Sequence, residues 1–234
     1  MLANTFLEDI ESIVSERNNY DLINLSDWNP SNNFIKSVDA ILPASFIQNG
    51  IDYIFSSEIN DEIKNKVKFK LGFGENKSLD LSFFDSGSLS IVNVIHLLSK
   101  IGIHNITIIS PSYFSVEYIC KDYAINCQYV ELQKQGASFI LPNNYDKILK
   151  NCQCIWLTNP VYCTGTYWEE NFINNLNNLI EGTDTLLVID ESLSEINQLI
   201  SPKISSGACI TITSPHKALC TNGIKFSVVL FPSQ

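Results

Sequence analysis

The stretch CQCIWLTNPVYCTGTYWEENFINNLNNLIEGTDTLLVID, residues 152–190, contains two apolar runs separated by a segment with helical spacing. The runs CQCIWLT (152–158) and TLLVID (185–190) are short and apolar, as buried strands are. The segment EENFINNLNNLIE (169–181) repeats apolar residues three and four positions apart, as an amphipathic helix does. A strand, a helix and a strand in this order predict two parallel strands joined by a crossover helix.

The same alternation continues on both sides of this stretch. Further apolar runs are LDLSFF (79–84), NITIIS (105–110), CQYVEL (127–132), ACITIT (208–213) and FSVVLF (226–231). Segments with helical spacing follow several of them: LSIVNVIHLLSK (89–100), YFSVEYICKDYA (113–124) and NNYDKILKN (143–151). About seven strands mostly separated by helices predict an α/β fold with a largely parallel sheet.

The first part of the chain has weaker signals. Residues 1 to about 20 have the spacing of an amphipathic helix, and the following residues, up to 56, are irregular and rich in Asn, Ser and Pro. Ser57 is placed to cap a charged helix, EINDEIKNKVKF (58–69). We therefore divide the chain into an N-terminal arm, residues 1–56, and a large domain, residues 57–234.

The composition excludes several partners and sites. The formal net charge of −10 argues against nucleic acid and anionic membranes as partners. The seven cysteines and three histidines show no zinc-site spacing, which indicates reduced thiols, no metal centre and a cytoplasmic protein. We expect no signal peptide and no membrane span. Charged residues make up only 17%, which favours a subunit interface.

Ligands of parallel α/β sheets bind at the carboxyl ends of the strands, so the residues that follow each run are the candidates for a site. Ser86, Gly87 and Ser88 follow the first run and open a helix, where free amides and hydroxyls can hold a phosphate. The alternative is an ordinary helix cap. Tyr113 follows the second run, and its ring either covers a pocket or packs in the core.

The later runs end in polar residues as well. Asn159 can donate to a ligand oxygen or form a simple Asn-Pro turn. Asp190 ends an apolar strand, where a carboxylate needs a cation or several donors. Ser214 and Lys217 follow the sixth run, and Lys225 precedes the seventh. Lys217 is either a nucleophilic amine or a surface lysine on a turn.

Taken in this order, the motifs resemble those of pyridoxal-phosphate (PLP) enzymes of the aspartate aminotransferase fold, the class I/II aminotransferases in particular. NPVYCTG (159–165) is similar to that family's Asn-Pro-x-x-Pro-Thr-Gly, and VIDES (188–192) to its Asp-Glu-x-Tyr. SPHKALCTNGIKFS (214–227) is similar to Ser-x-Ser-Lys…Gly-x-Arg-x-Gly. The resemblance covers roughly residues 20–234. It implies a three-layer PLP-binding large domain without the family's C-terminal small domain.

The resemblance also implies a role for each matching position. Lys217 would form a Schiff base with PLP, and Asp190 would keep the pyridine nitrogen protonated. Asn159 would donate to the ring hydroxyl, and Tyr113 would stack on the ring. The residues that would hold the phosphate are Ser86, Gly87, Ser88, Ser214 and Lys225, with Tyr53 reaching the phosphate of a neighbouring subunit.

Three positions depart from the family pattern. Lys225 stands where the family has arginine, Leu193 where it has tyrosine, and His216 where it has a small residue. We expect a homodimeric, PLP-dependent aminotransferase that acts on an amino acid or amine. The alternatives are another PLP reaction on the same fold, namely decarboxylation, elimination or oxidation, and a non-catalytic PLP-binding partner subunit.

Overall fold

A computed structural model of the chain describes residues 61–74, 78–135, 138–150, 152–205, 208–218 and 225–233. These residues all fall within one of the two units into which the chain divides, Ser45–Gln234. The predicted N-terminal helix, the predicted boundary after residue 56 and Tyr53 lie outside the described residues.

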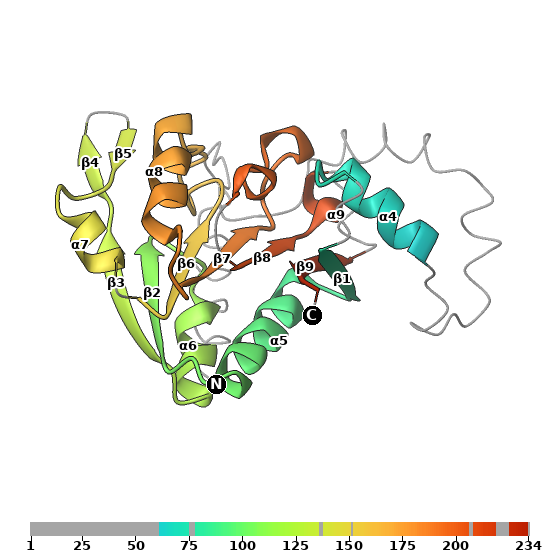
Figure 1. The fold of residues 1–234 in the computed structure, drawn as a ribbon, viewed down its shortest axis with the longest axis horizontal. Helices are drawn as coiled ribbons and strands as arrows, with labels where there is room; N and C mark the ends of the chain where they lie inside the picture. Colours follow the sequence, from blue (N-terminus) through green and yellow to red (C-terminus); the bar gives the residue numbers. More distant parts are fainter. Residues whose placement is uncertain are drawn as a thin grey trace, which may run out of the picture. The chain divides into compact units, whose positions relative to one another are not determined.

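A seven-stranded sheet forms the centre of the described part (Figure 1). Its strand order is β1-β9-β8-β7-β6-β2-β3. The strands are β1 (Leu79–Phe84), β2 (Asn105–Ser110), β3 (Asn126–Glu131), β6 (Cys154–Thr158), β7 (Leu186–Glu191), β8 (Ala208–Thr213) and β9 (Ser227–Pro232). Strand β9 is antiparallel to β1 and β8, and the other neighbouring pairs are parallel. The predicted α/β fold with a mostly parallel sheet is confirmed.

Helices cover both faces of this sheet (Figure 1). The helices are α4 (Asp61–Lys70), α5 (Gly87–Lys100), α6 (Ser115–Asp122), α7 (Tyr145–Leu149), α8 (Glu170–Ile180) and α9 (Pro215–Ala218), with short 3-10 helices η3 (Ile196–Gln198) and η4 (Ser201–Lys203). Helices α5 and α6 pack on one face, and α7 and α8 pack on the other. The result is the three-layer arrangement that the resemblance implies.

The central strands are apolar along their whole length because both of their faces are covered. In β6, Cys154 and Trp156 join the cluster under α5 and α6, whereas Ile155 and Leu157 join the cluster under α8. This alternation follows from the two-residue period of a strand. All five residues of β6 are buried.

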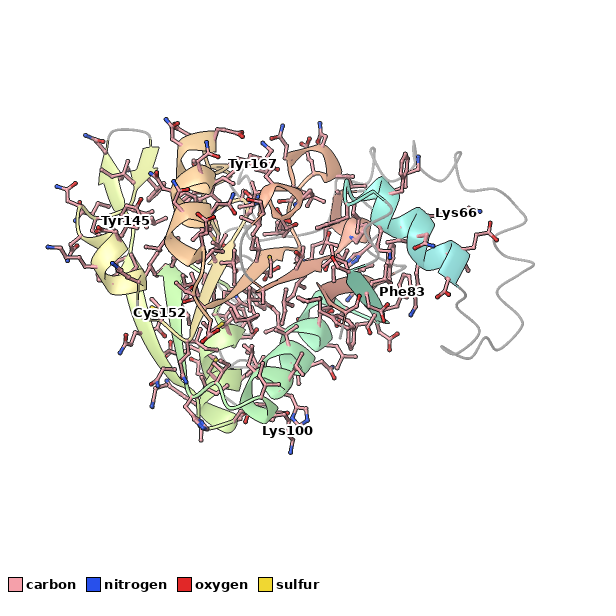
Figure 2. The ribbon with its side chains drawn as sticks, in the orientation of Figure 1. Lys66, Phe83, Lys100, Tyr145, Cys152 and Tyr167 are labelled. Atoms are coloured by element: carbon pink, nitrogen blue, oxygen red, sulfur yellow. The ribbon has the colours of Figure 1, made fainter. Side chains whose placement is uncertain are left out.

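Most charged side chains of the helices lie on the outer faces; Lys68 of α4 is an exception, because it is buried and its Nζ donates to the carbonyl of Leu79. Lys66 on α4 and Lys100 on α5 are exposed and point away from the sheet (Figure 2). Lys66 bonds to Glu62 one turn earlier, an exposed pair of the kind that adds little stability. The helices are therefore held mainly by their apolar sides.

One feature of the sheet region was not predicted from the sequence. Strands β4 (Gln133–Gln135) and β5 (Ser138–Ile140) form a separate two-stranded hairpin. The segment QKQ of β4 is polar and fully exposed, so it carries no apolar alternation that could indicate a strand.

The strand register brings the carboxyl ends of the parallel strands to one level. Thr158 at the end of β6 lies opposite Asp190 on β7, and Asp190 lies opposite Ile212 on β8. Phe84 at the end of β1 lies opposite Ser227, the first residue of β9. The loops after β1, β6, β7 and β8 therefore leave the sheet at the same edge.

Candidate active site

Three of the predicted site residues lie at this edge of the sheet, at the ends of the adjacent strands β6, β7 and β8. Asn159 follows β6, Asp190 is the next-to-last residue of β7, and Ser214 follows β8. The backbone N–H of Asn159 donates to the carbonyl of Asp190 at 2.9 Å, so the two strand ends are tied together. All three side chains are buried.

The N-terminus of α5 lies next to these strand ends. Ser86 caps the helix, and its Oγ accepts a hydrogen bond from the backbone N–H of Leu89 at 3.2 Å. A Cβ added at Gly87 would lie 2.8 Å from Ser214 Oγ and 3.2 Å from Ser192 Oγ. Only glycine allows the helix start to come this close to the two loops. The result is a helix N-terminus faced by hydroxyls, which is a suitable setting for an anion.

Lys217 lies in α9 and is half-buried. Burial lowers the pKa of its amine, the charge of Asp190 raises it in part, and the charge of Lys225 lowers it further. The charges of Lys217 and Asp190 therefore act on each other within one site. The net effect of burial and the two charges lowers the pKa of Lys217 and so favours the neutral amine, which is the nucleophilic form.

Asp190 is 6% exposed, and burial raises the pKa of its carboxyl. Hydrogen bonds from Ser192 and the charge of Lys217 oppose that rise; the backbone N–H of Ser192 donates to Oδ1 at 3.0 Å. A cationic group placed against this carboxylate would stabilise its ionised form.

Two tyrosines lie at this edge. The rings of Tyr113 and Tyr162 meet edge to face with centroids 5.8 Å apart, and Phe114 packs on Tyr113 at 4.6 Å. Burial, and to a smaller degree the charge of Asp190, raise the pKa of the Tyr162 hydroxyl. Tyr162 was not among the predicted residues. Its position inside the NPVYCTG loop was the only sequence signal that could have indicated it.

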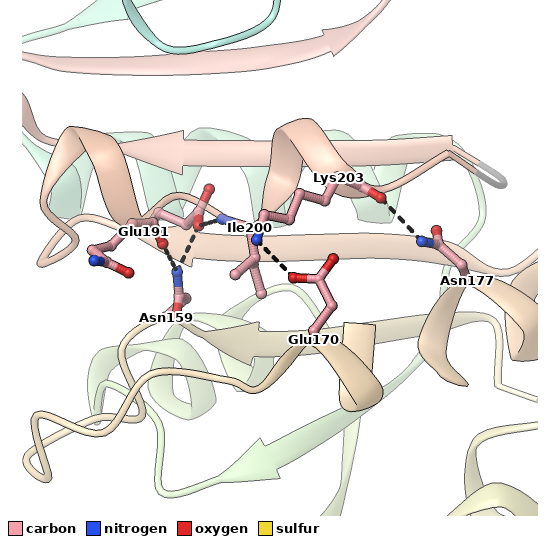
Figure 3. A network of polar contacts seen from close by, with 7 residues as sticks. Asn159, Glu170, Asn177, Glu191, Ile200 and Lys203 are labelled. Atoms are coloured by element: carbon pink, nitrogen blue, oxygen red, sulfur yellow. Dashed lines mark hydrogen bonds and ion pairs between the residues drawn. The ribbon is translucent and has the colours of Figure 1, made fainter. Parts of the chain in front are cut away.

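Asn159 is placed differently from what the resemblance implies (Figure 3). Its amide nitrogen donates to Glu191 Oε1 at 2.8 Å and to the carbonyl of Gln198 at 3.0 Å, so its protons are taken up by the protein. Its Oδ1 is buried and has no hydrogen-bond partner among the described residues. In this arrangement a polar group of a ligand would meet the amide oxygen of Asn159, not its nitrogen.

The remaining predicted residues lie at the rim of the site. Ser88 and Lys225 are exposed, and the charge of Lys225 acts on Lys217 and on His216. His216 is buried, and its Nδ1 donates to the carbonyl of Phe226 at 2.6 Å. This contact joins α9 to the start of β9 and so helps to fix Lys217. Burial lowers the pKa of His216.

Two kinds of feature are absent from the described residues, namely metal-binding clusters and membrane-spanning helices. Within them, no group of three or more His, Cys, Asp or Glu side chains could hold a metal ion. No helix in the part of the chain that the structure describes is long and apolar enough to cross a membrane.

Comparison with known families identifies one match. Residues 28–196 match the family model of aminotransferase class I and II, a family that depends on PLP. A comparison with curated protein sequences yields no match.

Solved structures share the fold at low sequence identity. An aromatic amino acid aminotransferase from Burkholderia cenocepacia has a TM-score of 0.77 at 10% identity, with 97% of this chain and 63% of that chain covered. The aspartate aminotransferase of Plasmodium falciparum has a TM-score of 0.73 at 15% identity, with 96% and 62% covered. A PLP-bound C-S lyase from Staphylococcus hominis has a TM-score of 0.66 at 19% identity, with 93% and 57% covered. The chain therefore spans about three fifths of the length of these structures.

Proposed function

Because the chain belongs to the aminotransferase class I and II family, we propose that it binds PLP at this sheet edge and acts on an amino acid or amine. The observation that carries the proposal is a half-buried Lys217, whose pKa burial lowers and whose charge interacts with the buried carboxylate of Asp190. A lysine on an ordinary surface turn would not share its electrostatic environment with a buried acid.

The residues present fit the cofactor's phosphate. Gly87 leaves space at the helix start, and Ser214 presents a buried hydroxyl there. Ser86 and Ser88 flank the same helix start, and Lys225 supplies a positive charge at the rim. A lysine gives charge without the two-pronged hydrogen bonding of an arginine, so we expect the hydroxyls and helix amides to orient the phosphate.

The residues present also fit the cofactor's ring. When bound, PLP supplies an aldehyde for an amine and a pyridine ring that withdraws electrons. Asp190 would hold the ring nitrogen in its protonated form, and Tyr113 would lie against the ring face. Asn159 would contact the ring hydroxyl, whose proton its buried, unpartnered Oδ1 would accept.

Lys217 has two tasks in this proposal. Its amine would hold the cofactor through the aldehyde, and the free amine would move a proton at the substrate's Cα. The lowered pKa suits both tasks, because a neutral amine is needed each time. We also propose that the protein is a cytoplasmic homodimer, on the basis of its family and its sparse charge.

A second reaction class is supported by one position. Leu193 stands where the family motif has a tyrosine, so the ring lacks the phenol that the motif would supply there. This change favours decarboxylation, elimination or oxidation as the alternative to amino transfer. Product analysis with a panel of amino acids, with and without an α-keto acid acceptor, separates these reactions.

The test of cofactor binding is chemical labelling of the amine. We expect that reduction of the PLP-loaded protein with borohydride places a pyridoxyl group on Lys217, identified by peptide mass mapping. Lys217→Ala should lose the label, whereas Lys225→Met should keep it, because it removes a nearby charge but not the amine. A label on another lysine, or no label in the wild type, would refute the proposal.

A further inference from the structure

We propose that Ser90 is a positioning residue: by donating to Ser227 Oγ, it keeps the hydroxyl proton of Ser214 available for a bound phosphate. The inference rests on the proposed function, because it concerns the phosphate end of the same site. Neither Ser90 nor Ser227 belongs to the set predicted from the sequence. Ser227 stands where the resembled motif ends in glycine, so its hydroxyl is an addition to that motif.

Four serines from four parts of the chain form a continuous row of hydroxyls. Ser192 follows β7, Ser214 follows β8, Ser227 begins β9, and Ser90 lies in the first turn of α5. The distances between successive Oγ atoms are 3.2 Å for Ser192 and Ser214, 3.3 Å for Ser214 and Ser227, and 2.9 Å for Ser227 and Ser90. All four side chains are buried, and those of Ser90 and Ser227 are 0% exposed.

Two acceptors beside the row, one next to Ser227 and one next to Ser192, fix the direction of its hydrogen bonds. Each serine hydroxyl has one proton to donate. Ser227 Oγ lies 2.8 Å from the carbonyl oxygen of Thr213, which can only accept, so Ser227 donates its proton there. At the Ser192 end of the row, the side chain of Ser192 bonds to the carboxylate of Asp190, which also accepts.

Ser227 Oγ is therefore an acceptor toward its two other neighbours, Ser90 and Ser214. Ser90 is nearer, at 2.9 Å against 3.3 Å, and supplies the hydrogen bond that Ser227 needs. Among the described residues, the proton of Ser214 then has two longer contacts with neutral hydroxyls to choose from, Ser192 at 3.2 Å and the already satisfied Ser227 at 3.3 Å. A phosphate would be preferred to both, because a hydrogen bond to an ionised acceptor is stronger than one between neutral hydroxyls.

Removing Ser90 should redirect the proton of Ser214 from the phosphate to Ser227. In Ser90→Ala, the buried Ser227 Oγ would have Ser214 as its remaining donor in this row, and leaving a buried acceptor unsatisfied is costly. The proton of Ser214 would turn toward Ser227 and away from the phosphate. We expect PLP to bind about fivefold more weakly, as the loss of one net hydrogen bond implies. Pyridoxal, which has no phosphate, should bind as it does to the wild type.

The decisive experiment is a double-mutant cycle on the full chain, with the dissociation constants of PLP and pyridoxal measured by absorbance. Ser227→Ala removes the competing acceptor, so both Ser227→Ala and the Ser90→Ala/Ser227→Ala double variant should bind PLP within about twofold of the wild type. Ser90→Cys keeps the volume and a weak donor, and should fall between wild type and Ser90→Ala.

Each outcome separates the inference from alternatives. A double variant that binds PLP more weakly than either single variant would show that the serines act only by packing, and would overturn the inference. So would equal weakening for PLP and pyridoxal, or unchanged PLP binding in Ser90→Ala. A wild type that binds no PLP would overturn the proposed function itself, and the inference with it. Circular dichroism of each variant checks that the fold is retained.

Discussion

The pKa of Lys217 depends on two neighbouring charges of opposite sign. Burial disfavours the charged amine, the carboxylate of Asp190 favours it, and the ammonium of Lys225 disfavours it. The pKa is lowered from 10.5 as the net result, so a larger fraction of the amine is neutral at a given pH than for an exposed lysine. The two neighbouring charges act in opposite directions, so each can be removed to give a shift of known sign.

We predict that the pH dependence of adduct formation between Lys217 and pyridoxal moves in opposite directions in two variants. Only the neutral amine reacts, so the rate rises as the pH increases through the pKa of Lys217. Lys225→Met removes a like charge, raises that pKa and should move the profile to higher pH. Asp190→Asn removes an opposite charge, lowers the pKa and should move the profile to lower pH. Pyridoxal is used because it has no phosphate for Lys225 to bind.

The control for this prediction is a cation outside the site. Lys203 is exposed and pairs with Glu170 at 3.0 Å on the outer part of the domain. Lys203→Met should leave the profile where it is. Shifts of the same sign in Lys225→Met and Asp190→Asn would contradict the electrostatic account of Lys217.

At the scale of elements, Glu191 links the end of β7 to the segment that contains η3 and η4 (Figure 3). Its side chain is 0% exposed, and burial raises the pKa of its carboxyl. Its Oε1 accepts from the backbone N–H of Ile200 at 2.7 Å and from Asn159 at 2.8 Å, and its Oε2 accepts from the hydroxyl of Ser201. One buried carboxylate thus connects β7, the loop after β6 and the start of η4.

We predict that Glu191→Gln destabilises the protein by about 1–3 kcal/mol, the typical cost of an unsatisfied buried group. Glutamine offers one acceptor oxygen in place of two, so either the Ile200 and Asn159 donors or those of Ser201 would face an amide nitrogen. Urea unfolding measures the loss. Glu195→Gln, an exposed change a few residues away, should have almost no effect. Equal stability of the two variants would show that the Glu191 network contributes little.

The candidate site was predictable where it follows the ends of apolar strands. Asp190, Ser214 and Lys217 were found in this way, because a polar residue directly after a buried run must lie at the sheet edge. Tyr162 and Glu191 were not identified from the sequence. Their roles depend on contacts with distant segments, which sequence spacing does not encode.

The whole described domain was largely predictable because its central strands are buried on both sides. Apolar runs such as residues 154–158 and 186–191 differ sharply from the amphipathic helices between them, so all seven strands of the sheet were located. The antiparallel direction of β9 was less accessible, since it depends on how the chain returns beside β8. The β4–β5 hairpin was missed because its strands are short and polar.

At the same scale, the sequence favours assembly into pairs. Only 17% of the residues are charged, which leaves much of the surface neutral or apolar. The resemblance of the sequence to class I/II aminotransferases implies that Tyr53 reaches the phosphate of a neighbouring subunit, which stays a prediction. If both inferences hold, the site that contains Lys217 of one protomer is completed by Tyr53 of its partner.

This arrangement predicts complementation between two defective variants. Lys217→Ala removes the amine, and Tyr53→Ala removes the residue offered to the neighbour, so each variant alone should bind PLP poorly at low cofactor concentration. In a hybrid dimer, the Tyr53→Ala protomer supplies Lys217 and the Lys217→Ala protomer supplies Tyr53, so one of the two sites has both native residues.

Co-expression with two different affinity tags isolates the hybrid, and light scattering gives its mass. We expect it to retain half of the wild-type content of borohydride-fixed PLP. A hybrid that binds no better than the Tyr53→Ala parent would mean that Tyr53 does not act across subunits. A protein that stays monomeric with full PLP occupancy would exclude the dimeric site altogether.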